Sequence, residues 1–347
     1  MNTSLSAIGS WRECQQKYWY RYVEGLKPKL ERPAPLLGSI LHRLLERFYL
    51  FIPGDPDDAL RQAIEFTCGE FQPKIDGLVF AAQTAGEDQL GLDLQDLLPR
   101  ALRIFERYFL VRGRPDFEQL WPVLVEYRYT LELDRGLQLV GIADLVAEQD
   151  GQRLLWEHKT TGSVPGQGRR LRDLQTTLMS AALEELGHGP INGVVWNYIR
   201  TKEPTVPALL KNGMLTTRAD LDSTWAVYQA EIQKHGLREE DYLPVKERLE
   251  GREEAVFFPR VVLPLMQAEH ILLRDFIATA RTVQAIRESG GNYIPVRSVG
   301  FGCDFCEYNK LCEAVILGGD EEEVVQRLFV RKESKEVASD NGDTSSP

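Results

Sequence analysis

Three polar residues on two neighbouring β-rich segments could do chemistry together. Asp144 lies in the first segment, Glu157 and Lys159 lie in the second, and Asp150 and Gly151 stand between the two segments. Asp-Gly between such segments is a strong hairpin signal. If these two residues form the turn, paired positions sum to 301, so Asp144 lies directly opposite Glu157. Because side chains alternate along a strand, Lys159 lies on the same face as Glu157.

Two carboxylates that face each other across a hairpin repel, since opposed Cβ atoms lie only about 4.5–5.5 Å apart. A divalent cation between Asp144 and Glu157 would remove this repulsion. Mg²⁺ or Mn²⁺ held there can polarise a phosphodiester and activate water. The Lys159 ammonium can offset the charge that develops in the transition state. The pattern therefore favours a metal-dependent hydrolytic site over its alternative, an ordinary charged strand surface.

The five cysteines also point to a metal site. Their odd number, in a chain that we expect not to be secreted, argues against a disulfide framework. Three of them form the compact motif Cys303-x₂-Cys306-x₅-Cys312, and Cys14 lies near the N-terminus. Four thiolates can hold either structural zinc or a [4Fe–4S] cluster. Cys68 lies in an apolar stretch, and we expect it to be a buried core thiol.

Composition restricts the class of protein. The 347 residues are 43% hydrophobic and 27% charged, which is typical of a globular protein. We find neither a long apolar run nor a basic leader, so we expect no membrane span, no secretion and a cytoplasmic location. The net charge of −11 argues against a protein that coats nucleic acid through bulk attraction. It does not argue against an enzyme that grips a few phosphates.

The order of the predicted elements indicates an α/β fold with a central sheet flanked by helices. Apolar spacing predicts helices at 4–23, 36–52, 57–73, 95–112, 173–187, 219–236 and 264–289, and strands at 121–133, 137–148, 152–160, 193–200 and 255–263. We expect one domain over residues 1–318, with a helical part (1–115), a core sheet (116–263) and a C-terminal helix with the cysteine segment (264–318). Residues 319–347 are charged and polar, and we expect a disordered tail.

The segments Gly141-Ile-Ala-Asp144 and Glu157-His158-Lys159-Thr160-Thr161 resemble the paired motifs of PD-(D/E)XK nucleases. Within this superfamily the chain most resembles the RecB-like branch, which includes CRISPR-associated iron–sulfur exonucleases and phage recombination exonucleases. The resemblance covers about residues 4–316. It implies a central mixed sheet flanked by helices, with an N-terminal helical part and a C-terminal iron–sulfur segment. It also implies a deoxyribonuclease in which Asp144, Glu157 and Lys159 are catalytic.

The same branch carries a histidine on an early helix, and Gly38-x-x-x-His42-x-x-x-Glu46 fits this pattern. The resemblance implies that His42, Asp144, Glu157 and the backbone carbonyl of His158 hold Mg²⁺ or Mn²⁺. The branch also usually has a glutamine and a tyrosine four residues apart, on the helix after the strand that carries the catalytic lysine. Gln175 fits and is implied to be catalytic, whereas Met179 stands in place of the tyrosine.

The branch further places one cysteine before the nuclease core and three after it. The resemblance therefore implies that Cys14, Cys303, Cys306 and Cys312 hold a [4Fe–4S] cluster. Zinc remains the alternative, although zinc modules usually draw their ligands as two close pairs, and Cys14 has no close partner.

The expected partner is DNA, as single strands or ends, in bacterial or phage recombination, repair or replication. Recombination or replication proteins are a further expected class of partner. This setting is implied by the resemblance alone. Arg169, Arg170 and Arg172 lie in a Gly-rich loop after the lysine strand and are candidates for phosphate contacts. A second basic patch comprises Arg12, Lys17, Arg21, Lys27 and Lys29. One rival is a non-catalytic nucleic-acid- or protein-binding module with a structural Cys₄ metal site. Another is a nuclease that acts on RNA.

Overall fold

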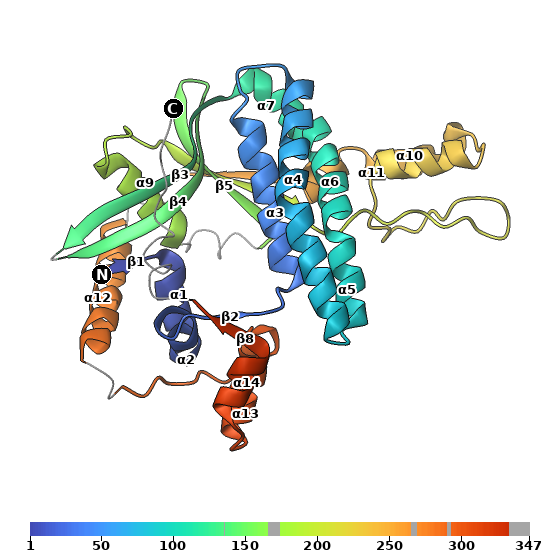
Figure 1. Cartoon of the computed structure of the whole chain (residues 1–347). Helices are drawn as coiled ribbons and strands as arrows, with labels where there is room; N and C mark the ends of the chain where they lie inside the picture. The colour runs from blue at the N-terminus through green and yellow to red at the C-terminus, as the bar shows by residue number, and fades with distance from the viewer. Residues whose placement is uncertain (135, 166–173, 265–268, 290–292, 333–347) are drawn as a thin grey trace.

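A mixed six-stranded sheet forms the centre of the computed structural model, which describes residues 1–134, 136–165, 174–264, 269–289 and 293–332 (Figure 1). Its strands are β1 (Asn2–Thr3), β3 (Trp121–Asp134), β4 (Leu137–Gln149), β5 (Gln152–Thr161), β6 (Gly193–Arg200) and β7 (Arg260–Leu263). Their order is β1-β4-β5-β6-β7, and β3 also pairs with β4. The β5–β6 and β1–β4 pairs are parallel and the others antiparallel, which confirms the predicted mixed sheet.

Helices cover both faces of this sheet. One face carries α3 (Pro33–Tyr49), α4 (Pro56–Thr84), α5 (Asp88–Gln95), α6 (Leu97–Tyr108) and α7 (Arg114–Gln119), with a π-helical turn at Phe109–Gly113. The other face carries α1 (Leu5–Glu13), α9 (Leu174–Glu185) and α12 (Glu269–Glu288). Because β5 and β6 lie between the two layers, both are buried along most of their length, as strands covered on both faces are.

Two predicted helices have different bounds in the structure. Residues 4–23 do not form one helix, because Cys14 has an extended backbone that ends α1 and precedes α2 (Gln15–Tyr18) and a π-helical turn (Trp19–Val23). The backbone amide of Gln16 donates instead to the carbonyl of Val296, a contact that no local pattern could predict. The α4 helix continues past Pro73 to Thr84, because its apolar face still packs on the core.

A small helical lobe is inserted between β6 and β7 and projects from the sheet (Figure 1). It contains α10 (Trp225–Lys234), a 3₁₀ turn (Glu239–Tyr242) and α11 (Leu243–Leu249), packed around a core of its own. The predicted strand at 255–263 is too long. Residues Glu253–Phe257 form a π-helical turn whose aromatic end packs into the main core, so only Arg260–Leu263 pairs with β6.

The predicted tail begins too early. The acidic residues that follow Asp320 form the first turn of α14 (Glu321–Leu328), where Asp320 accepts a hydrogen bond from the Glu323 amide, and negative charge is favourable at a helix N-terminus. Strand β8 (Phe329–Arg331) then pairs antiparallel with β2 (Leu26–Pro28). Val325 and Phe329 pack with Tyr308 and with Leu311 of α13 (Asn309–Ile316), a helix that follows a 3₁₀ turn (Phe301–Phe305). Residues 333–347 lie outside the described part of the chain.

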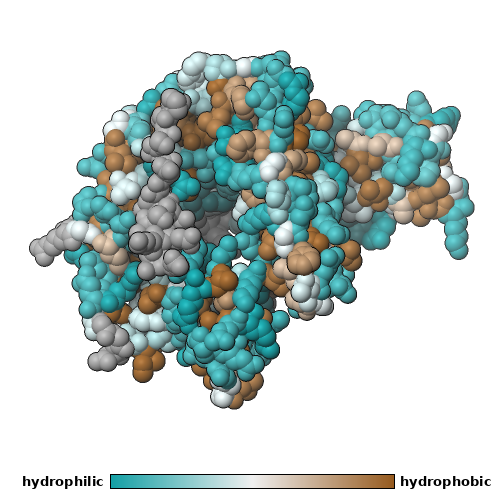
Figure 2. All heavy atoms as spheres, viewed as in Figure 1, coloured by the Kyte–Doolittle hydropathy of each residue, from teal (hydrophilic) through white to brown (hydrophobic). Residues whose placement is uncertain are grey.

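The face seen in Figure 2 is mostly hydrophilic and has a hollow at its centre. Below this hollow lie α1 and α2, and α3 lies beside it (Figure 1). Within the described ranges, no helix is long and apolar enough to cross a membrane.

Candidate active site

The candidate site lies where β4 and β5 separate. Their ladder runs from Gln149–Gln152 to Leu145–Trp156, and every pair sums to 301, which confirms the predicted register. Positive φ angles at the two turn residues, 51° and 75°, fit the expected tight hairpin turn. However, the ladder ends one step before the predicted Asp144–Glu157 pair. Asp144 Oδ2 instead accepts a hydrogen bond of 2.8 Å from the backbone amide of His158.

Beyond this point the same edge of β4 pairs with β1, at Gln138 and Leu139. Within the described part of the sheet, residues 140–144 have no strand partner on this edge, so β4 and β5 form a fork. Helix α3 crosses close to it. A side chain at Gly38 would come within 3.0 Å of Thr160 Oγ1, so a glycine here permits the close approach. His42 lies one turn further along α3.

At the fork, His42 meets two carboxylates. His42 Nδ1 lies 3.7 Å from Asp144 Oδ1 and 4.0 Å from Glu126 Oε1. The potential ligand atoms of the three residues all lie within 4.8 Å of one another. Their side chains are 13–32% exposed, so the group is open to solvent or to a ligand. Imidazole nitrogen and carboxylate oxygen are ligands that suit Mn²⁺ and related cations.

Glu126 was not among the residues predicted from the sequence. It lies on β3 between the pairs Val125–Leu145 and Tyr127–Ala143, so it is opposite Asp144. In the β3–β4 pair, the numbers of two paired residues add up to 271 next to the turn and to 270 beyond a register shift near Glu132. Counting from a two-residue turn at 135–136 would therefore have placed Tyr127 opposite Asp144. A regular hairpin rule could not have found Glu126.

The second part of the site comprises Glu157, Lys159 and Gln175. Lys159 Nζ donates to Glu157 Oε2 at 2.7 Å, and Gln175 Nε2 donates to the same oxygen at 3.0 Å. Lys159 Nζ also donates to Gln175 Oε1 at 3.1 Å. Glu157 is fully buried. The lysine strand and α9 thus hold together three residues that the sequence singled out.

Electrostatics make the site attractive to a cation. Burial raises the pKa of Asp144, and the neighbouring Glu126 raises it further, while His42 and Lys159 oppose this. Burial by itself would lower the pKa of His42, but Glu126 and Asp144 together raise it. The rise in the pKa of His42 reflects the negative charge of Glu126 and Asp144 at the fork, whereas burial is the main cause of the rise at Asp144. A divalent cation would neutralise this charge more completely than protons do.

The side chain of His158 lies in a buried polar network behind the site. Burial, followed by the nearby cations, lowers the pKa of His158 well below its usual value, so the ring is neutral. Its Nδ1 lies 2.9 Å from Asn197 Nδ2, and the ring of Tyr49 stacks on it at 5.5 Å. This arrangement fixes the strand segment whose amide binds Asp144.

The network ends on a buried ion pair. Arg260 donates to both carboxylate oxygens of Asp116, at 2.7 and 2.6 Å, and to Asn197 Oδ1 at 3.1 Å. The hydroxyl of Tyr49 donates to Asp116 at 2.6 Å. Strand β7 and helix α7 are thereby linked to the strand that carries Glu157 and Lys159. Buried polar groups are stable only when they are satisfied in this way.

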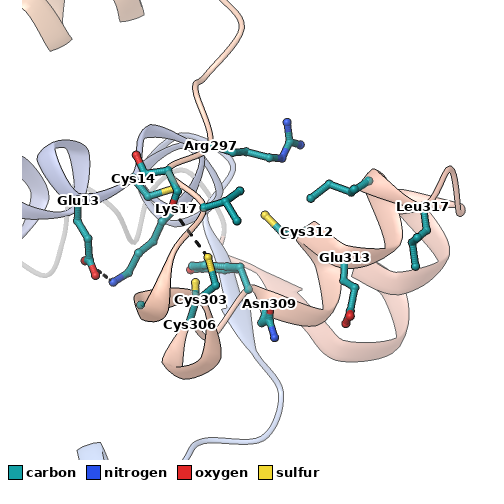
Figure 3. A pocket seen from close by; sticks show the side chains of 15 residues that line it. Glu13, Cys14, Lys17, Arg297, Cys303, Cys306, Asn309, Cys312, Glu313 and Leu317 are labelled. Carbon is teal, nitrogen blue, oxygen red and sulfur yellow. Dashed lines mark hydrogen bonds and ion pairs between the residues drawn. The ribbon is translucent and has the colours of Figure 1, made fainter.

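Four of the five cysteines line one cavity of about 460 Å³ (Figure 3). Cys14 lies at the break between α1 and α2, and Cys303, Cys306 and Cys312 lie in the segment that ends in α13. Burial raises the pKa of Cys306 and of Cys312. Cys68 lies apart on α4, where it packs against the other core but is only partly buried.

The predicted DNA-binding residues Arg169, Arg170 and Arg172 lie outside the described residues. In the second patch, Arg12 donates to the carbonyl of Asp275 and to Thr279 of α12, and Lys29 donates to the carbonyl of Gln326 in α14, so both join elements together. The other three residues of that patch line a cleft of about 780 Å³. The cationic side chains that line it are Lys17, Arg21, Lys27, Arg32, Arg287 and Lys332.

Among the described residues that line this cleft, the carboxylates are Glu31 and Glu307, so the described side chains carry six positive and two negative charges, a net +4. This local charge is opposite in sign to the −11 of the whole chain. The cleft also reaches Ser39, one turn before His42, and Val140 in the fork. It therefore extends to the neighbourhood of the candidate site.

Fold and site together define the class: an α/β core in which a strand fork gathers carboxylates, a histidine and a lysine. The model of the PD-(D/E)XK nuclease superfamily matches residues 2–313, nearly the whole chain. The chain therefore belongs to the PD-(D/E)XK nuclease superfamily, which confirms the resemblance at this level. Nucleases of this superfamily use divalent metals such as Mg²⁺ or Mn²⁺. No individual curated protein matches the chain.

Proposed function

We propose that this protein is a metal-dependent deoxyribonuclease, an exonuclease that acts on single-stranded DNA or DNA ends. The observation that carries the proposal is the fork between β4 and β5, where Asp144, Glu157, Lys159 and His42 gather in a chain of the nuclease superfamily. A binding module without catalysis would have no need for a lysine hydrogen-bonded to a buried carboxylate beside a second carboxylate.

Each residue has a role in this proposal. His42, Asp144, Glu157 and the carbonyl of His158 would hold Mg²⁺ or Mn²⁺. When bound, the ion supplies Lewis-acid polarisation of the phosphodiester and a stronger nucleophile at neutral pH. The Lys159 ammonium offsets the negative charge that develops on the phosphoryl oxygens. Gln175 bonds to both Lys159 and Glu157, and so orients the ammonium.

The positive cleft supports a nucleic-acid substrate. Its cations can contact phosphates, and Tyr22 and Phe305 line the same walls. Cations beside aromatic rings are the combination with which proteins bind single strands. Because the cleft extends toward His42 and the fork, a strand bound there would be led to the carboxylates.

The spacing of the cysteines around the cavity supports a [4Fe–4S] cluster over zinc as the proposed group. Four sulfurs around one zinc ion lie about 3.8 Å apart, since each Zn–S bond is about 2.3 Å. Among the described residues, one group of three or more His, Cys, Asp or Glu side chains has all its ligand atoms within 4.8 Å of one another, namely His42, Glu126 and Asp144. No three of the four thiols are therefore that close together, and they are spaced more widely than zinc requires. The cavity of about 460 Å³ leaves room for a larger group. A cluster there would join the N-terminal helices to the C-terminal segment.

A cleavage assay tests the function. Protein stripped with EDTA should leave end-labelled DNA intact, and added Mn²⁺ or Mg²⁺ should restore cleavage of single-stranded DNA. Labelled RNA of the same sequence is the matched substrate control. Retention of DNA without any cleavage in either metal would favour the binding module. Cleavage of RNA in preference to DNA would keep the site and change the substrate.

Anaerobically purified protein should be brown and should absorb near 400 nm. Serine at Cys14, Cys303, Cys306 or Cys312 should remove most of this absorption and the bound iron, because a thiolate ligand is lost. Cys68→Ser is the matched control and should keep both, since Cys68 lies on α4 away from the cavity. Stoichiometric zinc without iron in protein prepared without oxygen would overturn the cluster assignment.

A further inference from the structure

We propose that Glu126 is an additional ligand of the catalytic cation, on the side of the site opposite Glu157. This inference rests on the proposed function, because it concerns the same cation. It changes the composition of the site. The cation would be held by a carboxylate from each of β3, β4 and β5, together with His42 of α3.

The first support is geometric. Glu126 Oε1 lies 4.0 Å from His42 Nδ1, and His42 Nδ1 lies 3.7 Å from Asp144 Oδ1. Ligands around one Mn²⁺ or Mg²⁺ lie about 3 Å from one another, since each bond is about 2.1 Å long. Small side-chain adjustments would therefore bring these three atoms around one ion. Glu157, by contrast, has one oxygen engaged by both Lys159 and Gln175.

The second support is the backbone of Glu126, which has a φ of 47° in the middle of β3. Residues with side chains rarely adopt this conformation, and glycine adopts it without strain. The strand pairs on either side, Val125–Leu145 and Tyr127–Ala143, hold the backbone in place. A glutamate at such a position carries a cost in stability that a metal-binding role would explain.

The third support is charge. Asp144, Glu126 and Glu157 converge on the fork, and the cations that face them are Lys159 and, when protonated, His42. Without a metal the site retains an excess of negative charge in a partly buried position. Such an arrangement is unfavourable for stability alone. The alternative role for Glu126 is to orient His42 without touching the ion.

Metal affinity, measured in the wild-type and in a His42→Ala background, separates these roles without relying on cleavage, because an effect that acts through His42 disappears when His42 is absent. The probe is Mn²⁺ alone, titrated by calorimetry and by electron paramagnetic resonance into EDTA-stripped full-length protein. Glu126→Gln keeps size and shape and should raise the Kd for Mn²⁺ at least tenfold. Glu132→Gln, on the same strand but bonded to Gly136 and Gln138 at the hairpin end, is the matched control and should leave the Kd unchanged.

Glu126→Gly adds a second readout. Glycine accepts a φ of 47°, and the substitution also removes a charge, so metal-free protein should melt at a higher temperature than wild type. The same variant should lose the upward melting shift that Mn²⁺ gives to wild type. If the Glu126 variants bind Mn²⁺ as tightly as wild type while Asp144→Asn binds none, the assignment of Glu126 is overturned and the nuclease proposal stays intact. Wild-type protein that binds Mn²⁺ but cleaves nothing would overturn the nuclease proposal and leave Glu126 as a ligand. Wild-type protein that binds no divalent cation would overturn both.

Discussion

Lys159→Ala should reduce DNA cleavage by about 100-fold or more, the loss expected when one group that stabilises a transition state is removed. DNA binding, measured by fluorescence anisotropy in Ca²⁺, should change little, because the positive cleft supplies most of the phosphate contacts. Lys202→Ala is the control, since Lys202 is exposed and pairs with Asp222 away from the fork. Cleavage at the wild-type rate by Lys159→Ala would move catalysis elsewhere in the protein.

The same substitution should also affect stability. Glu157 is fully buried, and Lys159 lies 2.7 Å from its carboxylate. Removing one partner of a buried pair leaves an uncompensated charge and costs about 3 kcal/mol. Urea unfolding in EDTA should therefore show the loss. The deficit should shrink when Mn²⁺ is added, because the cation replaces the missing positive charge.

Asp144→Asn should abolish metal-dependent cleavage and metal-dependent stabilisation together. In wild type, a cation that binds only the folded state adds about 2.7 kcal/mol at a hundredfold excess over its Kd. Asparagine keeps an oxygen that can accept the hydrogen bond from the His158 amide, but it removes the charge that faces Glu126. In EDTA the variant should therefore unfold at the same or higher urea concentration than wild type.

The pH dependence provides a separate check on Asp144. Burial and Glu126 raise the pKa of Asp144, so the folded state binds this proton more tightly than the unfolded state does. Metal-free wild type should therefore lose stability as pH rises through the folded pKa of Asp144. Asp144→Asn should show a smaller loss over that range. A variant that is less stable in EDTA yet keeps the full Mn²⁺ shift would identify Asp144 as structural.

Local sequence rules determined the parts of the site that lie within one hairpin. Asp150 and Gly151 take positive φ angles with little strain, so the turn fixed a pairing sum of 301 across β4 and β5. Alternation along β5 then placed Glu157 and Lys159 on one face. These inferences succeeded because the paired residues are close in the sequence. Over such a short distance the geometry of a two-residue turn permits a single register of the two strands.

The end of the β4–β5 ladder could not be predicted in this way. Asp144 lies at one end of the stretch 140–144, which separates the part of β4 that pairs with β5 from the part that pairs with β1, and β1 lies at the N-terminus of the chain. Its hydrogen bond goes to the next amide, that of His158, in place of a pairing with Glu157. How far each strand pairs along this edge depends on segments that are distant in the sequence, which makes it a tertiary effect.

The tertiary structure also decided the position of Glu126 and the course of both chain ends. A register shift in the β3–β4 pair moved Glu126 opposite Asp144, and such a shift depends on packing across the whole sheet. The break at Cys14 depends on Val296, and the helix after Asp320 depends on the core around Tyr308. The sequence by itself determined which residues are the candidates for the chemistry, and it determined the register of the hairpin that holds three of them. Contacts between segments far apart in the chain decided which further residues joined them, because local patterns contain no information about such contacts.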